Sequence, residues 1–183
     1  MPKILLAAAI LSVLGCRRES PATVIPTESD LEERPSHESW GTDSYQSENG
    51  IPVIRMQAPY TRRYDHGDST LTILTAMHEQ RVIATIYDGD GAVTATVTAD
   101  EIRYVEEQNR FDAFGQVVVT TDSGKTLETE HLYWLDDKKM VYAPGFAKLR
   151  TTDRYIQGYE LEATEDLASY SMARVTGEVE VEE

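Results

Sequence analysis

The chain has 183 residues, of which 40% are hydrophobic, and its formal net charge is −15. This length suffices for one domain with a real core but not for two. The acidic surface repels nucleic acid, which we exclude as a partner, and it repels anionic membranes wherever basic residues do not cluster.

Residues 1–15 have the pattern of a secretory signal peptide. Lys3 is followed by the apolar run Ile4–Leu14, which only Ser12 interrupts. This run is too short to span a membrane comfortably. We therefore expect residues 1–15 to be removed from the mature protein.

The signal peptide ends in Val13-Leu14-Gly15-Cys16, which resembles the lipobox of bacterial lipoproteins. There a peptidase cuts before the cysteine, and the new terminal cysteine carries acyl chains. Cys16 is the only cysteine, so it has no disulfide partner in the chain. An ordinary leader with an incidental cysteine is the alternative. Cys16 is the predicted site of lipid attachment, and several acyl chains there would make the anchor effectively permanent.

The next segment, residues 16–50, is rich in Ser, Glu, Asp, Pro, Thr and Arg and poor in apolar residues. Such a composition predicts a disordered tether. A flexible coil of this length has a typical end-to-end distance of roughly 30 Å. Trp40 and Tyr45 are exceptions that could dock locally.

Residues 51–183 consist of short apolar or alternating runs separated by turn residues, which predicts an all-β domain. Ala92–Thr98 alternates most clearly, with apolar side chains on one face and threonines on the other. Asp88–Gly91 and Asp122–Gly124 have the composition of hairpin turns. Asp88–Gly91 also superficially resembles a calcium loop, but it lacks the spaced ligands and the distal glutamate. The run Val117–Val119 does not reveal which of its side chains face inward.

An internal repeat of about 30 residues is the most informative feature of this domain. A shift of 30 places Thr98–Tyr104 on Glu128–Trp134 and Gly115 on Gly145, and a further shift of 29 reaches Leu161. Units of this size cannot bury their own apolar face, so they must stack and share a core, leaving an unpaired edge at each end. The acidic tail of the chain could blunt one such edge. An acidic pair recurs in each unit, which predicts solvated turns rather than catalytic carboxylates: Glu106-Glu107, Asp136-Asp137 and Glu165-Asp166.

The same stretches carry a resemblance to the LptC/OstA-like family of lipopolysaccharide-export proteins, over about residues 52–182. Each motif is loose, whereas their order and spacing together are more specific. The matching stretches are Val97–Asp100, Phe114–Val119, Leu127–Trp134 and Ile156–Leu161.

The resemblance implies an open, twisted antiparallel β-jellyroll of the OstA-like type, whose facing sheets form an apolar groove. In such proteins, the acyl chains of lipopolysaccharide pass from an inner-membrane ABC transporter to an LptA-like bridge protein, which joins by edge-to-edge strand addition. It also implies a periplasmic protein held at the inner membrane, although many relatives have a transmembrane helix where this chain has a lipobox. The groove residues expected here are Ile102, Tyr104, Phe111, Val117, Val119, Leu132, Trp134, Val141, Leu149 and Leu161.

Two other classes of function remain open. A structural or adhesive envelope lipoprotein would bind protein partners through its β-edges and carry no lipid, and the groove residues would then be ordinary core. An enzyme is unsupported, because there is no G-x-S-x-G elbow or phosphate-binding glycine loop. We expect no cofactor and no metal site, since the histidines lack metal-ligand spacing: His37, His66, His78 and His131.

Overall fold

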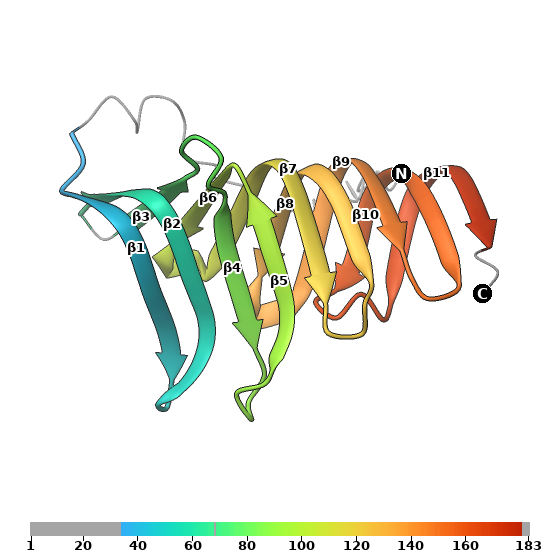
Figure 1. The fold of residues 1–183 in the computed structure, drawn as a ribbon, viewed down its shortest axis with the longest axis horizontal. Coiled ribbons are helices and arrows are strands. Elements are labelled where there is room, and N and C mark those ends of the chain that lie inside the picture. The colour runs from blue at the N-terminus through green and yellow to red at the C-terminus, as the bar shows by residue number, and fades with distance from the viewer. Residues whose placement is uncertain (1–33, 68, 181–183) are drawn as a thin grey trace, which may run out of the picture. The chain divides into compact units, whose positions relative to one another are not determined.

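The computed structural model describes residues 34–67 and 69–180, which are almost entirely antiparallel β structure (Figure 1). Within these ranges, eleven strands form one hydrogen-bonded sheet. This confirms the expected all-β, twisted, jellyroll-like fold. The elements are β1 (His37–Glu48), β2 (Ile51–His66), β3 (Ser69–Thr75), β4 (Val82–Tyr87), β5 (Val93–Ala99), β6 (Glu101–Val105), η2 (Glu106–Gln108), β7 (Arg110–Thr121), β8 (Thr126–Leu135), η3 (Asp136–Lys138), β9 (Met140–Arg150), β10 (Arg154–Thr164) and β11 (Tyr170–Glu180).

The long strands bend, so that their two halves belong to two facing layers (Figure 1). In β7, Phe114 pairs with Glu101 of β6, whereas Val118 pairs with Thr98 of β5. We call the layer with β3 and β6 sheet A, and the layer with β4 and β5 sheet B. Strands β2 and β7–β10 each have one half in sheet A and the other half in sheet B. These strands therefore connect the two sheets along one side, which we call the corner.

The corner of β7 is built by a glycine and an arginine. Gly115 and Gln116 have positive φ angles of 74° and 43°, and the register of β7 against β8 shifts there. A Cβ atom on Gly115 would collide with the Asp100 carboxylate. The Arg81 guanidinium donates to the carbonyls of Gly115 and Gln116 at 3.1 and 2.9 Å, and its Nε lies 3.2 Å from the Asp100 carboxylate. Arg81 thus gives the Gln116 carbonyl a partner at the bend and adds a second donor to the Gly115 carbonyl, which also accepts from Asp100 N–H at 3.1 Å.

The predicted repeat is confirmed in the fold. β6–η2–β7 and β8–η3–β9 have the same plan, and β10 and β11 flank the third acidic turn. Asn109 and Lys139 end the first two turns with positive φ angles. The turns also stack, because Asp136 N–H donates to the Asn109 carbonyl and Glu165 N–H donates to the Lys139 carbonyl, both at 3.2 Å.

The expected tether is wrong for residues 37–48, which form β1. The folded unit begins at Arg34, and β1 pairs with β2 along its whole length. The sequence of β1 has no apolar alternation that would predict a strand, because β1 is held by its pairing with β2 and not by an apolar face. Asp43 receives hydrogen bonds from Arg55 Nε and Nη2 at 2.8 and 2.5 Å, and Trp40 lies 5.4 Å from the Tyr60 ring. Residues 1–33, with the predicted signal peptide and Cys16, lie outside the described residues.

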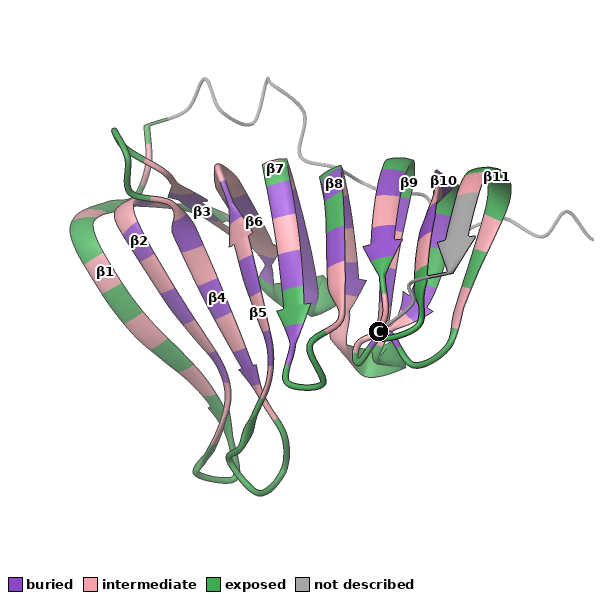
Figure 2. Cartoon of the chain, turned by 45° about the vertical axis from the view of Figure 1, so that its right-hand side comes forward, coloured by how far each residue is buried: buried purple, intermediate pink, exposed green. Residues whose placement is uncertain are grey.

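The inward-facing side chains of the two sheets form one apolar core, and buried residues alternate with half-buried or exposed ones along most strands (Figure 2). The structure resolves the ambiguity at Val117–Val119: Val117 and Val119 are buried, whereas Val118 is half-buried. In β8 the inward side chains are Leu127 and Thr129 before the corner and Leu132 after it, so the alternation shifts by one residue at the bend.

Candidate functional site

The predicted groove residues all contribute to the interior between sheets A and B. Nine of the ten are buried, and Tyr104 is half-buried against them. Three of their aromatic rings form a row across sheet A. Tyr104 stacks on Phe111 with ring centroids 4.3 Å apart, and Phe111 stacks on Trp134 at 5.2 Å.

The interior between the sheets is filled and does not form the open groove expected from the sequence. A cavity of about 30 Å³ lies between them. This is the volume of about one water molecule, whereas a small-molecule site usually has ~300–1,000 Å³. Large side chains such as Phe111 and Trp134 line this cavity and leave it narrow, and the binding of acyl chains here stays a prediction. An acyl chain enters this interior only if the two sheets separate.

Two larger hollows, which Val117 and Leu161 help to line, have charged residues in their linings. One of about 430 Å³ is lined by Gln116, Glu128, Glu130, Lys148 and their neighbours. The other, of about 420 Å³, is lined by Tyr133, Tyr142, Pro144, Glu160, Leu161, Glu162, Ser171, Met172 and Ala173. Exposed carboxylates in both make them poor hosts for an acyl chain.

Opposite the corner, the two sheets meet without a strand ladder, and we call this side the seam. The hairpin turns of sheet B face the acidic turns of sheet A here. Gln46 Nε2 donates to the Tyr104 hydroxyl at 3.2 Å, and Lys125 Nζ donates to the Asp166 carbonyl at 3.2 Å. Among the described residues, no backbone–backbone hydrogen bond crosses the seam. Each of these polar contacts across the seam therefore involves at least one side chain.

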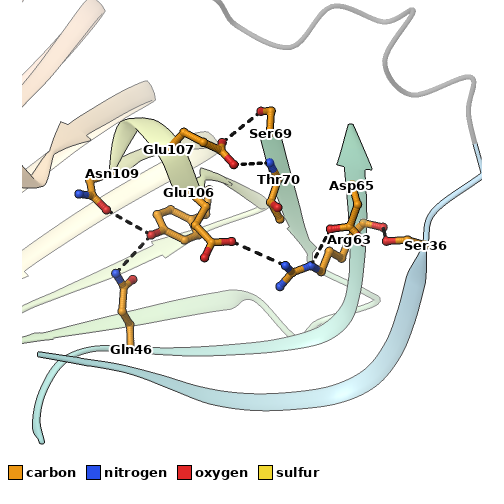
Figure 3. Close-up of polar contacts among 10 residues, drawn as sticks. Ser36, Gln46, Arg63, Asp65, Ser69, Thr70, Glu106, Glu107 and Asn109 are labelled. Carbon is orange, nitrogen blue, oxygen red and sulfur yellow. Dashed lines mark hydrogen bonds and ion pairs between the residues drawn. The ribbon is translucent and has the colours of Figure 1, made fainter. Parts of the chain in front are cut away.

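Figure 3 shows the end of the seam near β1, where Gln46 and Asn109 point toward the same hydroxyl. That hydroxyl belongs to Tyr104, which donates to Asn109 Oδ1 at 3.4 Å. Burial raises the pKa of Tyr104 above its ordinary value, so the phenol stays protonated and can donate. Tyr104 thus links β1 of sheet B to the η2 turn of sheet A.

The first acidic pair also holds sheet A together (Figure 3). Glu107 accepts hydrogen bonds from Ser69 Oγ at 3.1 Å and Thr70 N–H at 2.7 Å, and Glu106 lies 3.7 Å from Arg63. The pKa of Glu107 is lowered, first by its own backbone N–H and then by Thr70 and Ser69. Glu106 and Glu107 are both exposed, as expected for a solvated turn.

The third acidic pair departs from that expectation. Glu165 lines the cavity between the sheets beside Trp134, and neither Glu165 Oε2 nor Trp134 Nε1 has a hydrogen-bond partner, although both atoms are buried. Lys139 lies 5.6 Å from the centre of the Trp134 ring and forms an ion pair with Asp136. This turn differs from the other two because it follows the preceding acidic pair by 29 residues instead of 30, and its Leu167 points into the core. The shorter spacing is the feature of the sequence that indicates the difference.

The electrostatics of Glu165 follow from this position. Burial raises its pKa above the ordinary value, the positive charge of Lys139 opposes that rise, and Asp136 adds to it. The Trp134 indole also favours the ionised carboxylate, although its N–H completes no hydrogen bond. A half-buried carboxyl group therefore lines an otherwise apolar cavity.

A buried ion pair lies on the other face of sheet A. Arg110 donates to both oxygens of Asp112 at 2.6 Å, and His131 Nε2 lies 3.2 Å from Asp112 Oδ1. Burial works to raise the pKa of Asp112, but the hydrogen bonds from His131 and Arg110 outweigh it, so the pKa is lowered. The Arg110 guanidinium also lies 4.4 Å from the centre of the Tyr133 ring. This arrangement satisfies the charges and presents no free nucleophile.

Comparison with models of known protein families finds no match to this chain, and comparison with curated proteins finds none either. The part of the chain that the structure describes contains no helix long and apolar enough to cross a membrane. In the same ranges, no three His, Cys, Asp or Glu side chains gather to hold a metal ion. Fold and site define an all-β protein whose two sheets enclose an apolar interior with one side-chain seam.

Proposed function

We propose that this chain is an acyl-chain carrier of lipopolysaccharide export, acting as the LptC-type link between an inner-membrane ABC transporter and an LptA-like bridge protein. The observation that carries the proposal is the seam: among the described residues, no backbone–backbone hydrogen bond closes the apolar interior there. Exposing acyl chains to water costs about 0.8 kcal/mol per CH₂ group, so a carrier needs a continuous apolar surface. The inner faces of sheets A and B provide one once the seam separates.

The energetics of opening support this mechanism. Each polar contact across the seam contributes only about 0.5–1.5 kcal/mol net. When the sheets separate, packing against the acyl chains replaces the apolar packing of one inner face on the other. A lipid that buries a dozen CH₂ groups gains roughly 10 kcal/mol relative to water, which exceeds the loss of a few side-chain hydrogen bonds. No covalent chemistry is required, so the proposed function is not enzymatic.

The two ends of the sheet fit transfer between partners. β1 pairs only with β2, and β11 pairs only with β10, so each leaves one side unpaired among the described residues. A partner strand can add to such an edge through main-chain hydrogen bonds. This would extend the apolar interior from one protein to the next. The proposal assigns one edge to the transporter subunits and the other to the LptA-like protein.

The anchor belongs to the same proposal. Acyl chains on Cys16 would hold the protein in the periplasm at the inner membrane, beside the transporter. Replacing Cys16 with serine should release the protein from membranes in fractionated cells. Continued membrane association of the Cys16→Ser protein would contradict lipid attachment at this residue.

A second candidate function is a structural or adhesive lipoprotein that binds proteins through β1 or β11 and carries no lipid. The observation that favours it is the filled interior, with a cavity of only about 30 Å³.

Site-specific photocrosslinking in Gram-negative cells distinguishes the two candidates. A small diazirine amino acid replaces Leu132, which is 3% exposed and faces the interior, or the adjacent Tyr133 as the control. A carrier yields lipopolysaccharide adducts at position 132 and none at position 133. The absence of adducts at 132, with protein adducts formed at β11, would contradict the carrier and support the structural lipoprotein.

A further inference from the structure

The inner face of β1 is polar, although this strand lies at one end of an apolar interior (Figure 1). Three residues of β1 pair directly with buried core residues of β2, and directly paired residues lie on the same face of a sheet. The pairs are Thr42 with Ala58, Ser44 with Met56 and Gln46 with Ile54. All 12 residues of β1 are exposed or half-buried (Figure 2). The apolar lining of sheet B therefore ends at β2, and β1 adds a polar strip to it.

The side-chain contacts that hold β1 are few and largely open to solvent. On its outer side, Asp43 pairs with Arg55, and the two side chains are 43% and 32% exposed. Exposed ion pairs of this kind contribute little to stability. On its inner side, Gln46 reaches Tyr104 across the seam. The backbone ladder with β2 therefore holds β1 more than its side chains do.

That ladder is interrupted, and β2 has the composition of an edge strand. β2 contains Pro52 and Pro59, and proline occurs in sheets mainly on edge strands and at bulges because it has no N–H group to donate. The register of β1 shifts before Ser47, the partner of Pro52, and it skips Gly41 and Pro59. The ladders of β2 with β3 and β4 run without such a shift. β2 is therefore joined more regularly to the body of the sheet than to β1.

β1 can leave β2 without breaking another ladder. Among the described residues, it pairs only with β2. The two-residue turn Asn49-Gly50 connects the two strands, and its residues have φ angles of 51° and 82°. Rotation within this turn swings β1 away and exposes the edge of β2.

We propose that β1 is a displaceable strand, which occupies the edge of β2 until a partner strand takes its place. The partner is a β-strand with apolar side chains at alternate positions, which match Ile54, Met56 and Ala58. This inference rests on the proposed function, because acyl chains pass into a partner only if the apolar lining is continuous across the junction. A strand added to the free side of β1 leaves the polar strip between the two linings. At this end of the sheet, the edge-to-edge contact therefore forms on β2.

Two peptides of the length of β1 test the displacement. One has the sequence His37–Glu48, and the other carries Thr42→Val, Ser44→Val and Gln46→Leu. Each is added to the mature chain with Cys16→Ser. We expect the apolar peptide to bind at least about tenfold more tightly than the wild-type peptide, because its side chains are buried against the core residues of β2. Hydrogen–deuterium exchange should show that the amides of β1 lose protection in the complex, since the peptide replaces them on β2.

A disulfide between β1 and β2 supplies the matched control. Asp43→Cys and Gln57→Cys join directly paired positions, whose spacing suits a disulfide. Oxidation should abolish binding of the apolar peptide, and reduction of the same protein should restore it. Increased protection of β1, equal binding to the oxidised and reduced protein, or no binding of either peptide would overturn the displacement. The assay contains no lipid, so none of these outcomes decides the carrier function, which the photocrosslinking at Leu132 tests separately.

Discussion

Replacing Gly115 with alanine should destabilise the protein by about 2–3 kcal/mol. Gly115 has φ +74°, and left-handed backbone costs a residue with a Cβ about 1–2 kcal/mol. The new Cβ also collides with the Asp100 carboxylate, and overpacking of this kind costs about 1–3 kcal/mol. The lower chain entropy of unfolded alanine offsets about 0.4–1 kcal/mol. Urea unfolding measures the difference, and with a slope of about 2 kcal/mol/M the midpoint should fall by ~1 M.

The repeat supplies a matched control for this variant. Gly145 is the equivalent residue one unit later, but its φ is not positive and no atom would lie within 4 Å of an added Cβ. Gly145→Ala should therefore not destabilise the protein, and it should raise the free energy of unfolding by up to about 1 kcal/mol. Equal effects of the two substitutions would refute the role assigned to the β7 corner.

Three further predictions concern the interior and its charges. Trp134→Ala should lower the free energy of unfolding by about 3–5 kcal/mol in thermal unfolding, because it enlarges a buried cavity; a loss under 1 kcal/mol would contradict its place in the core. Glu165→Gln should stabilise the protein at neutral pH. Because the folded-state pKa of Glu165 is raised, its protonated form contributes stability at low pH that is lost as the pH rises through that pKa. The gain from Gln should therefore vanish in acid, and a gain that persists there would contradict the raised pKa of Glu165. The pKa of Asp112 is lowered, so its effect on stability runs in the opposite direction: wild-type stability should fall as the pH drops below 3.8. Asp112→Asn should remove that part of the loss in acid, which unfolding measured as a function of pH would show.

Much of the fold follows from local patterns in the sequence. Alternation identifies the strands, and the 30-residue spacing aligns η2 with η3 because each unit repeats the same strand–turn–strand plan. The inward positions at Ile102 and Leu132 follow from the same alignment, since stacked units must share one core. The predicted groove residues could be placed in the interior for that reason.

The remaining features depend on contacts that no local pattern records. β1 is polar, and it is ordered by its pairing with β2 and by contacts such as Asp43 with Arg55. The corners shift the alternation by one residue, so the inward side chains cannot be followed through a bend by period alone. The filling of the interior depends on how far apart the sheets settle, and no strand pattern encodes that spacing. The burial of Glu165 likewise depends on how the third turn packs.

The distance across the seam tests acyl-chain entry most directly. Nitroxide labels on cysteines at the exposed residues Asp122 and Ala168, in a chain with Cys16→Ser, report that distance by pulsed electron paramagnetic resonance and leave the contact of Lys125 with Asp166 in place. If acyl chains enter between the sheets, lipopolysaccharide should lengthen the distance by at least about 4 Å, the thickness of one inserted chain, while a pair at Asp90 and Asp122 within sheet B stays constant. An unchanged distance between labels at Asp122 and Ala168 in protein saturated with lipopolysaccharide would contradict acyl-chain entry between the sheets.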